Sequence, residues 1–239
     1  MVKRSVRLEY CFLFNYSDCF IAIILIHVNI PGDFRQAASK TKKLSEQLSI
    51  FTNRQIQLGA LATMFNLAGV YVVYTYLRPI FTTQLNIPAS FITITFTVYG
   101  FMSLLSNRLS GTMAERSGIK KMPLVYVVQF ILLILLPLVL RIPAIGLADL
   151  MLLGLTMYLI NSPVQLHMLS IAESKFPQSL VLASSLNSIF ANFGIALGSG
   201  VGSLIVKNLG LHYVGPGGAV FAITTLLLLI RLNKLAARE

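Results

Sequence analysis

Long apolar runs separated by short polar connections dominate the chain. A helix that crosses about 30 Å of hydrocarbon needs about 20 mostly apolar residues, and six runs satisfy this requirement. The runs are continuous rather than alternating, which favours helices over barrel strands. The pattern therefore predicts six membrane-spanning helices, near Gln57–Leu77, Phe91–Gly111, Met122–Leu140, Ile145–Leu166, Leu180–Val206 and Tyr213–Leu232.

A seventh apolar run, Phe12–Ile30, is interrupted by Asn15, Asp18 and His27. It is followed by the polar stretch Pro31–Ile56, which we interpret as a cytoplasmic linker or juxtamembrane helix. The charges of that stretch are also typical of an ordinary solvated helix face.

The composition agrees with a membrane protein. Hydrophobic residues make up 56% of the 239 residues and charged residues 11%, whereas soluble domains carry about 25% charged residues. The net charge of +11 does not indicate nucleic-acid binding, because the basic residues cluster between the apolar runs, where they set topology. With two cysteines, the chain can form neither a disulfide framework nor a four-cysteine metal site.

Basic residues orient the predicted spans. Lys and Arg gather in cytoplasmic loops, and twelve lie in the linker and the alternate loops on its side: Arg35, Lys40, Lys42, Lys43, Arg54, Arg116, Lys120, Lys121, Lys175, Arg231, Lys234 and Arg238. The opposite loops hold Arg78, Arg141 and Lys207. This bias predicts a cytoplasmic C-terminus. Lys3, Arg4 and Arg7 break the rule if Phe12–Ile30 spans, so either that run does not span or the chain starts inside a longer protein.

The sharpest motif joins the second and third predicted spans. Its glycines and charged residues are Gly111, Glu115, Arg116, Gly118, Lys120 and Lys121. We expect Gly111 to let two helices approach closely and Gly118 to adopt a backbone conformation that other residues resist. The motif resembles the loop signature of the major facilitator superfamily, with Glu115 where Asp is usual. In that family a weakened copy lies in the second half, and the alternative interpretation is an ordinary basic loop.

Two further stretches resemble the drug and sugar efflux branch of that superfamily. Thr75–Pro79 is similar to the end of its seventh helix, although Pro79 also ends a helix for ordinary reasons. Asn187–Gly202 is similar to its eleventh helix and carries glycines at every fourth position, which predicts a flat stripe for helix packing. The stripe consists of Gly194, Gly198 and Gly202.

Polar residues inside the spans are the candidates for a substrate cavity. They are Asn66, Tyr74, Asn161, Gln165 and Asn192. Asn66 and Tyr74 share a helix face, and either line a cavity or hydrogen-bond to a neighbouring helix. Asn161 and Gln165 flank Pro163, which we expect to kink the end of its span.

One acid, Asp149, lies within a well-defined span. It either takes up protons or serves as an interfacial cap or as a partner of Arg141.

We therefore predict an all-α polytopic transmembrane bundle that is the six-helix C-terminal half of a major facilitator fold. Residues 1–30 are interpreted as the remnant of a preceding helix, 31–56 as the linker, 57–232 as the bundle and 233–239 as a cytoplasmic tail. The resemblance implies export of a drug, sugar, amino acid or purine by proton antiport across the plasma membrane. We expect such a half to be inactive unless it pairs with an N-terminal half or a second copy.

No enzyme motif is present in the sequence. There is no phosphate-binding loop, metalloprotease motif or nucleophile elbow, so we predict no catalytic residue, metal or cofactor. Two alternatives from other classes stay open: a seven-helix receptor, whose usual signatures are missing, and a channel-type assembly subunit held together by the glycine stripe.

Overall fold

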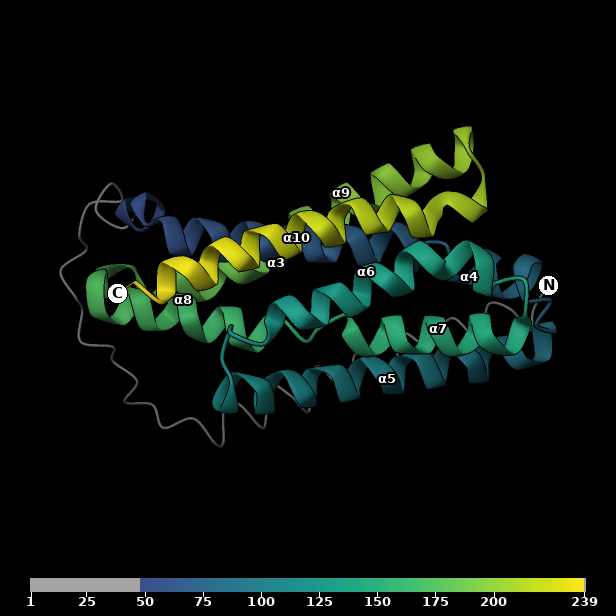
Figure 1. Ribbon diagram of the computed structural model, residues 1–239, viewed down its shortest axis with the longest axis horizontal. Helices are drawn as coiled ribbons and strands as arrows, with labels where there is room; N and C mark the ends of the chain where they lie inside the picture. Colours follow the sequence, from purple (N-terminus) through teal and green to yellow (C-terminus); the bar gives the residue numbers. More distant parts are fainter. Residues whose placement is uncertain (1–47, 239) are drawn as a thin grey trace, which may run out of the picture. The chain divides into compact units, whose positions relative to one another are not determined.

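The computed structural model describes residues 48–238, all of which belong to one compact unit, Lys43–Glu239 (Figure 1). Within these residues the chain is helical and contains no strand, which confirms the predicted all-α transmembrane bundle. The predicted helix remnant at 1–30, most of the linker and Glu239 lie outside the described residues.

Twelve helical segments follow one another in the described part of the chain. They are η1 (Ser49–Thr52), α3 (Arg54–Tyr74), α4 (Leu77–Pro79), η2 (Ile80–Gln84), α5 (Ala89–Arg116), α6 (Met122–Val139), α7 (Pro143–Thr156), α8 (Asn161–Lys175), η3 (Pro177–Ser179), α9 (Leu180–Asn208), η4 (Leu211–Tyr213) and α10 (Val214–Ala236). They form six helices that are long and apolar enough to cross a membrane.

Two spans extend furthest beyond their predicted ends. The first continues through α4 and η2 to Gln84, so Pro79 does not end it. The fourth continues through α8 to Lys175, beyond the predicted end at Leu166. In both cases the proline occupies the first turn of a resumed helix, where its missing N–H costs no intrahelical hydrogen bond.

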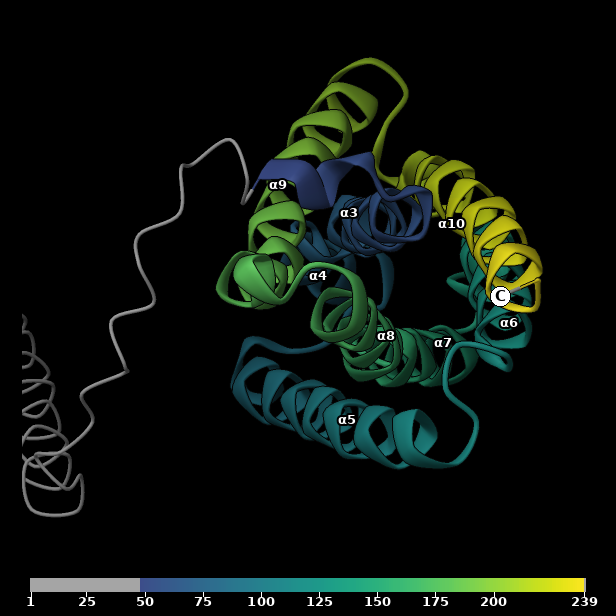
Figure 2. The same cartoon turned by 90° about the vertical axis from the view of Figure 1, so that its left-hand side faces the viewer.

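The six spans form two triples, and each triple packs against the other through its first span. The first span of the first triple, α3, contacts α9 and α10 of the second. The first span of the second triple, α7 with α8, contacts α5 and α6 of the first, and α6 contacts α10 (Figures 1 and 2). This exchanged packing is the arrangement expected of two inverted three-helix repeats.

The glycine stripe of α9 lies directly against α3. A Cβ built on Gly194 or Gly198 would overlap the carbonyl oxygens of Met64 and Ala68, respectively. A Cβ on Gly202 would crowd the carbonyl oxygen of Val72. The two backbones therefore approach to a distance that side chains do not permit, which is the packing that small residues every four positions provide in membranes.

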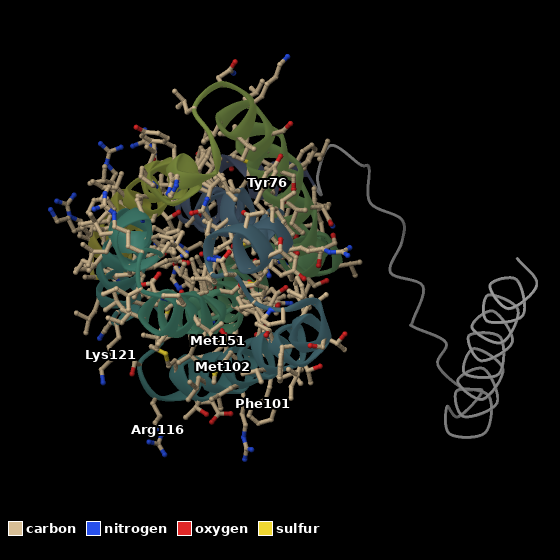
Figure 3. All side chains as sticks on the ribbon, turned by 90° about the vertical axis from the view of Figure 1, so that its right-hand side faces the viewer. Tyr76, Phe101, Met102, Arg116, Lys121 and Met151 are labelled. Atoms are coloured by element: carbon tan, nitrogen blue, oxygen red, sulfur yellow. The ribbon has the colours of Figure 1, made fainter. Side chains whose placement is uncertain are left out.

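Burial differs strongly between spans. In the most apolar window of each span, 67% of the residues are buried in the span that contains α3, but only 17% in α5 and in the span that contains α9. Several large apolar side chains of α5 and α9 are consequently exposed, among them Phe101, Leu104 and Phe193. Figure 3 shows Phe101 on the outer side of α5. These faces are available to lipid or to another bundle.

Candidate functional site

The helix of the fourth span is interrupted at its middle. Residues Met157–Ile160, which we call the break, separate α7 from α8. Pro163 contributes to the interruption because it lacks the N–H that would bond the carbonyl of Leu159 in a continuous helix. A backbone that leaves the helix inside a membrane must find other hydrogen-bond partners. The side chains around the break provide them.

Asn66 of α3 supplies one of these partners. Its side chain is 1% exposed, and Nδ2 donates to the carbonyl oxygen of Met157 at 3.1 Å. That carbonyl is free because the amide of Asn161 bonds to Tyr158 instead, at 3.1 Å. The Oδ1 atom of Asn66 is buried without a hydrogen-bond partner. Of the two roles predicted for Asn66, the structure places it in contact with a neighbouring helix, and contact with a substrate stays a prediction.

Two serines of α5 supply the remaining partners. The hydroxyl of Ser110 donates to the carbonyl of Leu159 at 3.0 Å and accepts from the amide of Ser162 at 3.0 Å. The hydroxyl of Ser106 accepts from the amide of Tyr158 at 3.0 Å. Both serines are fully buried. The break is therefore a built feature that depends on side chains from α3 and α5.

Tyrosines gather beside the break. The rings of Tyr71 and Tyr74 lie 5.0 Å apart, and those of Tyr74 and Tyr99 lie 5.8 Å apart. Tyr71 also packs, together with Tyr158, on the buried cluster that contains Met157. Tyr74 is 38% exposed, so this tyrosine cluster presents one open aromatic face. Aromatic faces of this kind bind apolar and cationic groups.

The other predicted cavity residues lie at different depths. Asn161 begins α8 directly after the break, and its Oδ1 atom is buried without a partner. Gln165 is half-buried one turn later. Asn192 is exposed on α9, where its amide donates to the carbonyl of Ser188 in its own helix at 2.9 Å. The structure thus brings Asn66 and Asn161 to the break, and it places Tyr74 against Tyr71 and Tyr99.

Asp149 is buried in the membrane-spanning helix α7. Its side chain is 6% exposed, and Oδ2 has no hydrogen-bond partner. Arg141 is exposed, and no ion pair joins the two residues in the described structure. The interpretation of Asp149 as a partner of Arg141 is therefore wrong. A buried carboxyl inside a membrane span without a charged partner is energetically costly, and such residues mark functional positions.

The loop signature connects the end of α5 to α6 at one end of the bundle. Gly118 has φ +53° and its amide bonds to the carbonyl of Met113, which confirms the predicted conformation. A Cβ on Gly111 would meet no atom of the described residues within 4 Å, so the close approach predicted there is not made within this bundle. Asn233 of α10 instead fixes the loop, because its Nδ2 donates to the carbonyl of Ile119 at 3.1 Å.

The charged residues of the loop signature face outward. Glu115, Arg116, Lys120 and Lys121 are all exposed. Figure 3 shows Arg116 and Lys121 pointing away from the helices. Their predicted role in gating requires contact with another bundle or with headgroups, and it stays a prediction.

Sequence reasoning did not identify Ser106, Ser110 or Tyr99 as site residues. Small hydroxyl residues are frequent in membrane helices because they permit close packing, so a serine alone carries no signal. The available signal was the spacing: Ser106 and Ser110 are four residues apart on one helix face. That face meets the span that contains Pro163.

Comparison with known proteins identifies transporters. No protein-family model matches the chain. It is 26% identical over 220 residues to the uncharacterized MFS-type transporter YtbD of Bacillus subtilis, covering 92% of this chain and 55% of that protein. YbcL, another uncharacterized MFS-type transporter of B. subtilis, is 28% identical over 219 residues, with 87% and 53% covered. The inner membrane transport protein YdhP of Escherichia coli K12 is 23% identical over 209 residues, with 87% and 52% covered.

The chain therefore spans about half the length of the curated relatives it matches. The similarity to proteins named as MFS-type transporters, together with six helices that are long and apolar enough to cross a membrane, supports a multi-pass membrane protein related to such transporters. The names of these relatives are those of transporters and not of enzymes, receptors or channels.

Proposed function

We propose that this chain forms the second six-helix bundle of a major facilitator transporter that exports a small molecule in exchange for protons across the plasma membrane. The observation that carries the proposal is the break at the middle of the fourth span. This span is the first of its triple and packs against the helices of the other triple. In secondary transporters, binding sites lie near the midplane where a helix is discontinuous, at the interface between repeats. The similarity to three transporters over most of the chain supports the same function.

The substrate in this proposal lies beside the break, between this bundle and another one. Tyr74 offers an exposed aromatic face, Asn161 a polar oxygen without a partner, and Asn192 an exposed amide. An aromatic wall with a few polar groups suits a small, partly apolar molecule. Drugs, sugars, amino acids and purines all remain within this class.

The orientation in this proposal follows from the distribution of charge. Eight basic residues lie at the end of the bundle where α3 begins and α10 ends: Arg54, Arg116, Lys120, Lys121, Lys175, Arg231, Lys234 and Arg238. The opposite end of the described bundle holds Arg78, Arg141 and Lys207. Because positive charge collects on the cytoplasmic side, we propose that the C-terminus is cytoplasmic.

Asp149 is our candidate for the group that carries protons. It is the one acid among the described residues that is buried within a membrane span. Exchange of a proton at this carboxyl would change the charge of the bundle interior, and a change of that kind biases the bundle toward one of its two arrangements.

A single bundle contacts a substrate from one side only. The exposed apolar faces of α5 and α9 are the surfaces on which a second bundle would pack. We therefore propose that this chain does not transport alone, and that its partner is an N-terminal half or a second copy.

A cell-based accumulation assay tests the proposal. The chain alone is compared with a chimera in which it replaces the matching segment of YtbD, using a compound whose accumulation intact YtbD is first shown to lower in the same assay. We expect the chain alone to leave accumulation unchanged and the chimera to lower it. Export by the chain alone would overturn the proposed inactivity, and an inactive chimera that reaches the membrane at normal levels would count against a transporter bundle.

The same chimera tests the proton-carrying residue. We expect Asp149→Asn to remove the dependence of export on a pH gradient, because an amide has no proton to exchange. The matched control is Glu173→Gln, which neutralises an exposed acid of α8 and is expected to keep that dependence. Export that follows the pH gradient equally in both variants would exclude Asp149 from coupling.

A further inference from the structure

A second site lies far from the break, at the end of the bundle where α3 begins and α10 ends (Figure 2). A pocket of about 380 Å³ opens there between the two helices. Its lining consists of Arg54, Gln57, Leu58, Arg231, Lys234, Leu235 and Arg238. Four of the seven residues are cations, and none of the acids of the described chain is among them.

The four cations converge from two helices. Arg231 and Lys234 are three residues apart and share one face of α10, and Arg238 follows two residues after the helix ends. Arg54 is the first residue of α3 and faces them across the pocket. All four are exposed, and no ion pair with an acid neutralises any of them within residues 48–238. Like charges held together without a counter-charge repel one another, which an anion in the pocket would relieve.

The helix dipoles do not account for this cluster. Cations near the C-terminus of α10 are favoured by its dipole, but Lys234 is the one of the three that lies in the last turn of that helix. Arg54 lies at the N-terminus of α3, where the dipole disfavours a cation and attracts an anion. The side chain of Asn53 caps this terminus by accepting from the amides of Gln55 and Ile56. An anion bound between the helices would be stabilised by the dipole and by all four side chains.

The apolar part of the lining identifies the source of the anion. Leu58 of α3 and Leu235 of α10 are half-buried, so each helix contributes one aliphatic wall. Both helices belong to membrane-spanning segments that end here, which places the pocket at the boundary between headgroups and hydrocarbon. Basic pockets between membrane helices at this depth suit lipid headgroups. An inorganic anion would contact the cations but would make no apolar contact with Leu58 and Leu235.

We propose that this pocket binds the headgroup of an anionic phospholipid. The cations hold the phosphate, and the acyl chains leave the pocket over Leu58 and Leu235. The proposal requires only that the chain lies in a membrane, so it does not depend on the proposed transport function. It gives α3, which carries Asn66 at the break, a lipid-dependent anchor at its first turn.

Native mass spectrometry of the full chain in mild detergent tests this proposal. The chain is titrated with phosphatidylglycerol or phosphatidylcholine that carry the same acyl chains. Each cation near a membrane surface contributes about fivefold in affinity for an anionic lipid. We therefore expect the first phosphatidylglycerol to bind about tenfold or more tightly than the first phosphatidylcholine.

Two triple variants separate the pocket from general surface charge. The first variant combines Arg54→Gln, Arg231→Gln and Lys234→Gln. We expect it to bind phosphatidylglycerol at most about twofold more tightly than phosphatidylcholine. The matched control, Arg116→Gln with Lys120→Gln and Lys121→Gln, removes three charges from the same end of the bundle. It is expected to keep most of the preference. Equal losses in the two triple variants, or an unchanged preference in the first, would overturn the proposal.

Inorganic phosphate distinguishes the two sources of the anion. We expect millimolar phosphate to leave bound phosphatidylglycerol in place, because phosphate lacks the acyl chains that contact the leucines. If phosphate displaces the lipid and binds the detergent-solubilised chain by itself, the pocket is a site for a soluble anion and its assignment to a lipid is wrong.

Discussion

Replacing Gly198 with leucine is expected to disrupt the contact between α9 and α3. A Cβ at this position already overlaps the carbonyl oxygen of Ala68, and the obstacle is backbone, which cannot move aside as a side chain does. Overpacking of well-packed interiors costs about 1–3 kcal/mol and occasionally more. Because the two helices must separate along their length, we expect a loss near or above the upper end of that range, about 3 kcal/mol. That loss lowers the midpoint of thermal unfolding in detergent by roughly 6–12 °C.

Gly200→Leu is the matched control for this substitution. Gly200 lies two residues further along α9, and a Cβ there meets no atom of the described residues within 4 Å. Leucine also favours a helix over glycine by about 0.5–1 kcal/mol. We expect this variant to unfold at the same temperature or slightly higher. If the Gly198→Leu and Gly200→Leu variants unfolded at the same temperature, the glycine stripe would not be what holds α9 and α3 together.

The glycine stripe illustrates how much of this fold could be predicted from the sequence. Span positions follow from the length of apolar runs, and their orientation from the charges between them, since both reflect the bilayer and not the details of packing. The close contact at Gly194, Gly198 and Gly202 follows from residue size and spacing. The same reasoning predicts a close approach at Gly111, which no atom of the described bundle makes. A single small residue permits a contact but does not specify one.

The break could not be located from the sequence. Pro163 suggested a kink near the end of its span, but α8 continues to Lys175 and the interruption lies at Met157–Ile160, before the proline. The proline acts on the carbonyl one turn earlier, and the interruption is stable because Ser110, 49 residues earlier in sequence, bonds that carbonyl. The partners of an interrupted helix are set by tertiary packing, which local patterns do not record.

The environment of Asp149 likewise could not be predicted from the sequence. Sequence proximity to the end of the span suggested an interfacial partnership with Arg141. In the structure the carboxyl is buried on α7, whereas Arg141 is exposed in the turn before that helix. The position of a polar residue along a span sets its depth in the membrane. Which neighbours it meets depends on the rotation of the helix, and that is fixed by packing against α5 and α6.

A second prediction concerns Ser110, whose hydroxyl bonds the backbone of the break. Substitution of Ser110 by alanine removes the hydroxyl that bonds the carbonyl of Leu159 and the amide of Ser162 inside a buried interface. Each buried group left unpaired costs about 1–3 kcal/mol in proteins, and hydrogen bonds between membrane helices average about 0.6 kcal/mol with a maximum near 1.7. We expect Ser110→Ala to lower the free energy of unfolding by about 1–3 kcal/mol, measured by SDS titration of the chain in mild detergent. Hydrogen exchange at Tyr158–Ser162 is expected to become faster in parallel.

Ser103→Ala controls for the loss of a serine from the same helix. Ser103 is half-buried on α5, and its hydroxyl bonds only to the carbonyl of Tyr99 in its own helix, at 3.2 Å. That carbonyl keeps its place in the helical ladder when the hydroxyl is removed, so we expect a change within about 0.5 kcal/mol. Exchange at the break should also stay as in the unmodified chain. If the two alanine variants unfold together and exchange alike, the interruption of the fourth span does not depend on α5, and the break is a property of the sequence around Pro163 alone.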